Sequence, residues 1–363
     1  MPTTIQGFPD TFAADVESLL EHLQGSNADT ILFIAAHAGD PVDDATAATI
    51  SLVTPTSVEM ELQTPQGAVS RVFEIDEITE LAGMQASLIG LLGVARTASP
   101  DHPQTSIEAV LNSTADLKTY VTTVVATERI TPALVQLTLA GGLDDLPAVG
   151  GDEFFYVLVP RRGAEDVIGD DFTMADRESG PEDRRPFGAY YTTRRRRDGE
   201  IDLWVVLHDH DEGVAAWARE AAPGDRVAIW GPRSVFQPVE DAAGHLLVCD
   251  ETGMAAAASL IDQLADDHPV TLVVETADED HLPPFPEREA VRVHPVFRGD
   301  AEPGTSGGLL AAVQGLAIET DRMAAFGAAE SREISAVRRH LRRERGMEHA
   351  HVNMTGYWRR DNS

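Results

Sequence analysis

The pattern of apolar residues changes character along this 363-residue chain. From 117 to 240, short apolar runs such as FFYVLVP and IDLWVVLH predict β-strands, and helical spacing occurs only in GVAAWAREA. From 243 to 356, short strands such as HLLVC alternate with helical segments such as AAAASLIDQLADD. The first pattern favours an antiparallel β-barrel, whereas the second favours a parallel α/β sheet.

The first block, residues 10 to 97, mixes helical and alternating patterns and predicts a small α+β domain. TASPDHPQTS, which follows it, has the Pro, Ser and Thr density of a linker. The chain is therefore expected to be multi-domain. The expected parts are an α+β domain at 1–97, a linker at 98–116, a β-barrel at 117–240 and an α/β domain at 241–363.

Charge and cysteine content exclude several functions. The net charge of −32 argues against a nucleic-acid partner, and an anionic ligand would need a local basic pocket. Cys249, the single cysteine, excludes an internal disulfide, and no His, Cys and carboxylate cluster has metal-ligand spacing. With no basic leader and no run of 18 apolar residues, we expect a cytoplasmic protein without membrane insertion.

The segment GAYYTTRRRR, residues 188–197, places four arginines directly after two tyrosines and two threonines. Strand alternation predicts Tyr191 and Thr193 on one face and Thr192 and Arg194 on the other. A guanidinium suits phosphate oxygens, so these arginines either hold an anion or form the solvated end of a hairpin.

Two turns could offer backbone amides to a phosphate. Gly213 opens a helix after the strand that ends at His208, and the segment DET (250–252) joins a buried strand to a helix. No G-x-G-x-x-G occurs, so the standard dinucleotide fingerprint is absent. Glu275 and Asp278, after the next strand, could accept ribose hydroxyls and would repel a 2′-phosphate, which favours NADH over NADPH.

Residues 117–359 resemble the siderophore-interacting protein family, the flavin-dependent ferric-siderophore reductases of the wider ferredoxin-reductase-like fold. The resemblance rests on seven stretches in the same order: ITPALVQLTLAG, YTTR, LHDHDEGVAAWA, PGDRVAIWGP, CDETGMAAAASLI, AAESREISAVRRHLR and GYWRR. It implies a β-barrel that binds FAD, an α/β domain that binds NADH or NADPH, and a ferric siderophore as substrate. It implies no acid, base or nucleophile of the protein's own.

The resemblance also implies roles for single residues. Tyr191 would pack against the isoalloxazine, Thr192 would reach its N5 edge and Arg194 would neutralise the pyrophosphate. Arg359 and Arg360 would attract the anionic ferric chelate. The cofactor-binding candidates are Tyr191, Thr192, Thr193, Arg194, His208, Gly213, Val214, Ala215, Asp250, Glu251, Thr252, Glu330, Tyr357 and Trp358.

Six positions in four segments depart from the family pattern. Ala189 replaces an arginine, Ala329 a glycine and Thr355 a lysine, and Gly253-Met254-Ala255 stands for Ala-Leu-Pro. These departures keep two alternatives open. One is a weakly active or non-catalytic protein that binds haem or an iron chelate, and the other is a flavin-dependent reductase that serves a protein partner.

Residues 12–96 resemble, less specifically, the small domain appended to haem-utilisation proteins. His22 and His37 could ligate haem. The preferred interpretation is that these histidines are surface or packing residues and that the domain mediates homodimer formation.

Overall fold

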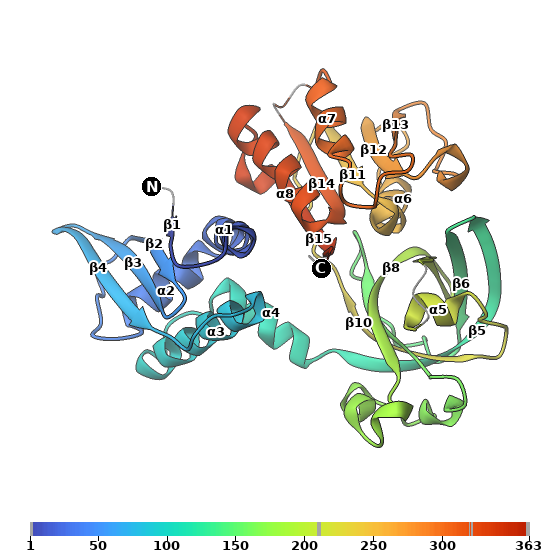
Figure 1. The fold of residues 1–363 in the computed structure, drawn as a ribbon, viewed down its shortest axis with the longest axis horizontal. Coiled ribbons are helices and arrows are strands. Elements are labelled where there is room, and N and C mark those ends of the chain that lie inside the picture. The colour runs from blue at the N-terminus through green and yellow to red at the C-terminus, as the bar shows by residue number, and fades with distance from the viewer. Residues whose placement is uncertain (1–2, 209–211, 319, 321, 361–363) are drawn as a thin grey trace. The chain divides into compact units, whose positions relative to one another are not determined.

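The computed structural model describes all residues except 1, 2, 209–211, 319, 321 and 361–363. It divides the chain into two compact units, Met1–Asp116 and Leu117–Ser363, which are coloured blue to cyan and green to red in Figure 1. Each unit buries its own apolar core.

The first unit is the expected α+β domain. A sheet in the order β1-β2-β3-β4 packs one face against helices through buried side chains such as Ile50, Met60 and Phe33. Its elements are β1 (Thr4–Ile5), α1 (Asp10–Ser26), α2 (Ala28–His37), β2 (Ala47–Thr54), β3 (Ser57–Thr64), β4 (Gly67–Glu74), α3 (Leu81–Ala98) and α4 (Ser106–Ala115).

The stretch 98–116, predicted as a linker, differs from expectation because it is an ordered part of the first unit. Arg96 clasps it. Its Nη1 donates to the carbonyl oxygen of His102 (2.6 Å), and its Nε and Nη2 donate to Glu108 (2.8 and 2.6 Å). The ion pair lowers the pKa of Glu108 to about 2. The Pro, Ser and Thr residues therefore form a loop fixed by one guanidinium, and α4 follows it.

The second unit begins with a closed barrel, strand order β10-β5-β6-β9-β8-β7, in which all neighbours are antiparallel. Closure leaves no free strand edge, and side chains such as Val157, Leu203 and Val227 fill the interior. The elements are β5 (Lys118–Thr131), β6 (Leu134–Ala140), β7 (Phe154–Val159), β8 (Phe187–Arg197), β9 (Glu200–Val206), α5 (Val214–Ala218) and β10 (Arg226–Arg233).

A five-stranded parallel sheet in the order β13-β12-β11-β14-β15 completes the unit. The strand order reverses between β11 and β14, so ligands are expected at the carboxyl ends of these two strands. The elements are β11 (Gly244–Cys249), α6 (Met254–Gln263), β12 (Val270–Thr276), β13 (Val291–Phe297), α7 (Gly308–Gly315), β14 (Met323–Glu330), α8 (Ser331–Arg339) and β15 (Val352–Trp358).

One helix among the described residues, α3, is long and apolar enough to cross a membrane by length and composition alone. Its buried face, made of Met84, Leu88, Leu92 and Ala95, packs into the core of the first unit.

Candidate functional site

A chain of hydrogen bonds joins the barrel to the last strand of the α/β domain. Thr192 Oγ1 on β8 donates to Tyr357 Oη on β15 (3.4 Å), and Tyr357 Oη donates to Asp152 Oδ2 (3.2 Å). The other oxygen of this buried aspartate accepts bonds from the Ser234 hydroxyl and the next two backbone N–H groups. Burial, assisted by the Asp152 charge, raises the pKa of Tyr357, so the phenol keeps its proton. Two motifs 165 residues apart therefore meet here.

Asp250 organises the turn after β11 at the switch point. Its carboxylate accepts from Thr252 N and Oγ1 (2.8 and 2.5 Å), Glu330 N (2.9 Å) and Trp358 Nε1 (2.7 Å). Burial raises the pKa of Asp250, and the bonds from Thr252 and Trp358 oppose that rise. Asp250, expected to contact a cofactor, thus holds β11, β14 and β15 together. Position 253 requires glycine, because a Cβ there would lie 2.2 Å from Ala328 O.

The segment 298–307 lies against the carboxyl ends of the strands. Arg298 pairs with Glu251, and the Ser306 hydroxyl donates to Glu275 at the end of β12. Gly304 packs against Trp358 and Glu330, where a Cβ would lie 3.3 Å from Trp358 Cη2 and 2.7 Å from Glu330 Cγ. Burial raises the pKa of Glu275 to about 7.

Two acidic residues near this edge act as helix caps. Glu330 caps α8, where its carboxylate accepts from Arg332 N (2.6 Å) and Glu333 N (3.0 Å). Asp278 is exposed and pairs with His281 at 2.5 Å. The cofactor-binding candidates Asp250, Glu251 and Glu330 are therefore brought together, while each is also held by a protein partner.

The two tyrosines of β8 point to opposite faces. Tyr191 lies opposite Phe155 and packs against the barrel core, where burial raises the pKa of its phenol. Tyr190 is exposed and contacts the rings of Phe154 and Tyr156, with centroids 5.8 and 4.8 Å away. Tyr190 is therefore the tyrosine that the barrel presents on the same outer face as Thr192.

The predicted strand parity ends after Thr192. Thr193 and Arg194 are both buried, and the register of β8 with β9 shifts between Thr193 and Arg195. Arg194 Nη1 donates to Asp262 Oδ2 on α6 (2.6 Å), and its guanidinium lies 5.1 Å from the centroid of Trp204. This residue, assigned from the sequence to a diphosphate, is placed by the structure between the barrel and α6.

The other three arginines of the segment differ in their contacts. Arg195 is exposed. Arg197 instead binds both carboxylate oxygens of the buried Asp202, at 2.5 and 2.8 Å. Arg196 pairs with Glu153 at 2.9 Å.

No sequence pattern singled out Arg233. Its guanidinium lies 4.8 to 5.2 Å from the ring centroids of Phe154, Tyr190 and Trp230. Its Nε and Nη2 are buried and have no hydrogen-bond partner within the part of the chain that is described. We call these four side chains the Arg233 box. The rings come from three strands, so no local pattern indicated it.

Gly213 precedes α5 with φ 100° and ψ −177°, and this cap position makes no side-chain hydrogen bond. A Cβ on Gly213 would meet no atom within 4 Å, while Val214 and Ala215 are buried in the barrel core. The first turn of α5 therefore has no side-chain cap on its N–H groups, which fits a phosphate. His208 is exposed nearby, and residues 209–211 lie outside the described chain.

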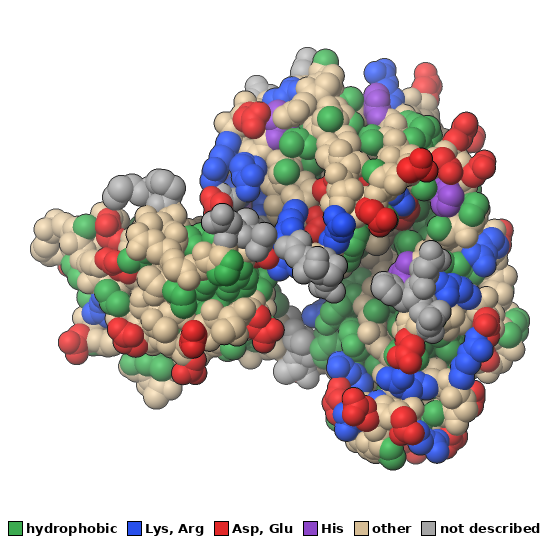
Figure 2. All heavy atoms as spheres, in the orientation of Figure 1, with side chains coloured by type: hydrophobic (Ala, Val, Ile, Leu, Met, Phe, Trp, Pro, Cys, Tyr) green, Lys and Arg blue, Asp and Glu red, His purple; other side chains and the backbone are tan. Residues whose placement is uncertain are grey.

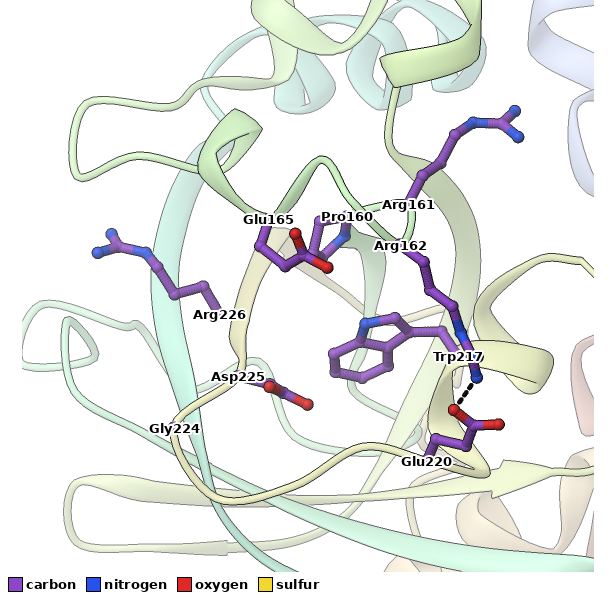
Figure 3. Close-up of a pocket in the computed structure, with 9 residues that line it drawn as sticks. All are labelled: Pro160, Arg161, Arg162, Glu165, Trp217, Glu220, Gly224, Asp225 and Arg226. Carbon is purple, nitrogen blue, oxygen red and sulfur yellow. Dashed lines mark ion pairs between the residues drawn. The ribbon is translucent and has the colours of Figure 1, made fainter.

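A cavity of about 520 Å³ lies beside α5 (Figure 3). Its volume is within the usual range for ligand pockets. Trp217 projects from α5 into it, and Arg162 and Glu220 form an ion pair at its edge. The lining residues are Pro160, Arg161, Arg162, Glu165, Trp217, Glu220, Gly224, Asp225 and Arg226.

The C-terminal arginines lie next to the switch point. The backbone N–H of Arg360 donates to Glu330 Oε1 (3.4 Å), and the side chain of Arg359 is partly buried. Their assignment to the chelate stays a prediction.

Of the two candidate haem ligands in the first unit, the structure describes the side chain of one, His37. His37 is partly buried, its Nδ1 lies 3.0 Å from Ser99 Oγ, and its ring contacts Phe33 and His102. Burial, with the nearby His102, lowers the pKa of His37. The side chain of His22 lies outside the described structure. Within the described ranges, no group of three or more His, Cys, Asp or Glu could hold a metal ion.

The barrel followed by a parallel α/β domain is the ferredoxin-reductase-like arrangement. The structure aligns with the ferredoxin reductase in carbazole 1,9a-dioxygenase with a TM-score of 0.52 over 67% of this chain and 70% of the other, at 15% identity. At that identity the likeness concerns the fold alone.

Comparisons of sequence and structure identify the family. Residues 123–236 match the siderophore-interacting FAD-binding domain, and residues 242–361 match the siderophore-interacting protein model. A siderophore utilization protein from T. fusca is 30% identical, with a TM-score of 0.59 over 68% of this chain and 95% of the other. The chain therefore belongs to the siderophore-interacting protein family.

Two curated relatives are longer than the region they share with this chain. The Escherichia coli NADPH-dependent ferric-chelate reductase is 34% identical over 158 residues, which are 41% of this chain and 59% of that protein. The mycobactin import ATP-binding/permease protein of Mycolicibacterium smegmatis is 30% identical over 241 residues, which are 65% of this chain and 25% of that protein.

Proposed function

We propose that the protein is an FAD-dependent reductase that takes electrons from NADH or NADPH and reduces Fe(III) in a siderophore, so that Fe(II) is released in the cytoplasm. One observation carries this proposal. The segments YTTR, DET and GYW, which the family resemblance assigns to flavin and nucleotide, meet through the Thr192–Tyr357 and Asp250–Trp358 hydrogen bonds.

FAD supplies the conversion between a two-electron hydride donor and a one-electron metal acceptor. The uncapped first turn of α5 would hold its diphosphate, and Gly213 leaves room for close approach. Tyr190 and Thr192 share the outer barrel face beside Tyr357, so this face would position the ring. Asp152 would accept the Tyr357 proton and so leave the phenol oxygen to accept the bond from Thr192.

The Arg233 box would receive the ferric chelate. In a chain of net charge −32, an anionic chelate needs a local cation. Arg233 offers two N–H groups without a protein partner, and the exposed ring of Tyr190 lies 4.8 Å from its guanidinium. Arg359 and Arg360 would add positive charge near the switch point.

The carboxyl-end edge of the parallel sheet would receive the nicotinamide nucleotide. Glu251, Glu275 and Glu333 lie along this edge, and Arg298 is already paired with Glu251. A 2′-phosphate would add negative charge to this setting, which supports NADH as the donor.

A spectroscopic titration tests the proposal. The purified protein is mixed with FAD under anaerobic conditions, and NADH is added before a ferric siderophore and a chromogenic Fe(II) trap. We expect the flavin absorption to bleach with NADH and to recover with the siderophore as the Fe(II) complex forms. A protein that binds no FAD, or a bound flavin that the siderophore does not reoxidise, would overturn the proposal.

A non-catalytic chelate-binding protein is the second candidate. It is favoured by the engagement of Arg194 with Asp262 and by Ala189, which stands where the family has an arginine. In that case a ferric siderophore would bind and quench the tryptophan fluorescence of the protein. Neither NADH nor photoreduced flavin would then produce Fe(II).

A further inference from the structure

Two histidines of the first unit lie side by side next to the loop that Arg96 holds. His37 ends α2, and His102 lies in the loop between α3 and α4. Their ring centroids are 5.4 Å apart. Both rings contact the buried ring of Phe33, with centroids 5.1 and 4.4 Å away. His37 is half-buried and His102 is exposed, so solvent reaches the pair.

Both imidazoles are held through the same ring nitrogen. His102 Nδ1 lies 2.9 Å from the carbonyl oxygen of Pro103, and His37 Nδ1 lies 3.0 Å from Ser99 Oγ. A carbonyl oxygen only accepts, so Nδ1 of the neutral His102 ring carries the proton and its Nε2 keeps a lone pair. The Ser99 hydroxyl can also accept, which gives His37 the same tautomer. Neither Nε2 atom has a hydrogen-bond partner among the described residues.

Paired imidazole nitrogens are ligands of transition metals. Zn²⁺, Cu²⁺, Ni²⁺ and Fe²⁺ bind neutral imidazole, whereas Mg²⁺ and Ca²⁺ prefer oxygen ligands. A ligating histidine usually donates its other ring N–H to an oxygen atom, and this bond orients the ring. Pro103 provides that oxygen for His102, and Ser99 provides it for His37.

The charge around the pair suits a cation. Residues 1–116 contain only two arginines and no lysine, and Figure 2 shows acidic side chains scattered over the visible face of this unit. The charge of Asp43 favours a cation at His37, whereas Arg71 and Arg96 oppose it. Arg96 is already engaged in an ion pair. Burial lowers the pKa of His37, so its imidazole is neutral at neutral pH.

The arrangement of the rings does not suit haem. Two axial histidines hold the iron from opposite faces of the macrocycle. His37 and His102 instead contact each other and share the ring of Phe33. The space beside their Nε2 atoms therefore suits a small ion and not a porphyrin between the two rings.

We propose that His37 and His102 bind one divalent transition-metal ion through their Nε2 atoms. The remaining coordination positions belong to water, since the described residues contain no group of three or more His, Cys, Asp or Glu that could hold a metal ion. Half of the binding free energy of a four-ligand zinc site corresponds to a Kd of about 1 µM to about 200 µM. The site does not depend on the proposed reductase activity, although Fe²⁺ belongs to the same class of ion.

Calorimetric titration of the full chain with ZnCl₂ at about 0.15 M salt tests the proposal. We expect one Zn²⁺ per chain, and His37→Ala and His102→Ala should each weaken binding at least about 10-fold. His268→Ala is the matched control and should bind like wild type. His268 belongs to another histidine pair, in which its Nε2 lies 2.7 Å from His245 Nδ1.

Electron paramagnetic resonance with one equivalent of Cu²⁺ gives a readout that reports the ligands directly. We expect hyperfine splitting from two imidazole nitrogens in the wild-type protein and from fewer in either histidine variant. Because His102 is exposed, His102→Ala should keep the wild-type circular dichroism spectrum, which separates loss of a ligand from loss of the fold.

Several results would overturn the proposal. Wild-type protein that binds no Zn²⁺ would remove the site, and binding that is unchanged in both histidine variants would assign the ion to surface carboxylates. Binding that is lost in only one of the two variants would show a single histidine ligand. Binding that is lost in His268→Ala would place the ion at the other pair. A protein that binds haemin through His37 but no Zn²⁺ would assign this histidine to haem.

Discussion

Arg194 Nη1 on β8 lies 2.6 Å from Asp262 Oδ2 on α6. The pair is asymmetric, because the guanidinium side chain is 7% exposed and the carboxylate side chain is 35% exposed. A buried charge that loses its partner destabilises the fold, because water cannot reach it. A partly exposed charge that loses its partner is hydrated instead. The ion pair therefore fixes the barrel against α6 and, with Trp204 beside it, leaves Arg194 little freedom.

We expect Asp262→Ala to lower the free energy of unfolding by about 2–4 kcal/mol, because it strands the buried guanidinium of Arg194. A double-mutant cycle with Arg194→Ala should give a coupling free energy of about 1–3 kcal/mol, measured by urea unfolding. The control cycle pairs Asp262 with the exposed Arg195, whose Nη2 is 3.9 Å away, and should give less than about 0.5 kcal/mol. Equal couplings in the two cycles would contradict the assignment.

We expect Arg197 to stabilise the folded state and not to contribute to flavin binding. Arg197→Ala removes two bonds to the buried Asp202 and leaves the Thr138 hydroxyl as a remaining donor at 2.7 Å. We expect a loss of about 1–3 kcal/mol in unfolding free energy. Flavin absorption after gel filtration should equal that of wild type. Loss of flavin absorption in Arg197→Ala would contradict this prediction and would assign Arg197 to the cofactor site.

The order of domains could be predicted from the sequence because it depends on periodicity. Strand-only patterns gave the barrel, and strand–helix alternation gave the parallel sheet. The Pro-rich stretch before α4 could not be read correctly, because its order depends on one guanidinium, Arg96, in the preceding helix. Composition describes the flexibility of an isolated segment and takes no account of hydrogen bonds from a residue outside that segment.

The candidate site was predictable in its parts and not in its contacts. The motifs that contain Thr192 and Tyr357 were recognised, yet their hydrogen bond spans 165 residues. Strand parity assigned Arg194 to the face of Thr192, but the register shift beyond Thr193 altered it. Arg233 was missed because its aromatic neighbours come from three strands, and closure of the barrel is what brings them together.

Arg233→Leu should impair binding of the ferric chelate. It removes the cation from the Arg233 box, so we expect the KM for an anionic ferric siderophore to rise about 10-fold or more, while kcat falls less. The rate of flavin bleaching by NADH should not change. Arg177→Leu is the matched control, since Arg177 lies 5.3 Å over the ring of Tyr156 on the same barrel face. Loss of bound flavin in Arg233→Leu, with an unchanged KM after FAD is restored, would assign Arg233 to the cofactor instead.

Glu275 should make the stability of the protein fall between about pH 4.5 and pH 7. Burial raises the pKa of this carboxyl to about 7, so the folded state keeps a proton that the unfolded state releases near its ordinary value of 4.5. Because the folded state binds more protons in this window, raising the pH disfavours folding. We expect Glu275→Gln to increase the free energy of unfolding by about 1–3 kcal/mol at pH 8 and by little at pH 4.5, measured by urea unfolding.

The exposed Glu279 gives the control for Glu275, and Glu279→Gln should follow the wild-type pH dependence. A Glu275→Gln variant that is destabilised equally at both pH values would show that the carboxyl is ionised in the folded state and that its bond from Ser306 depends on that charge.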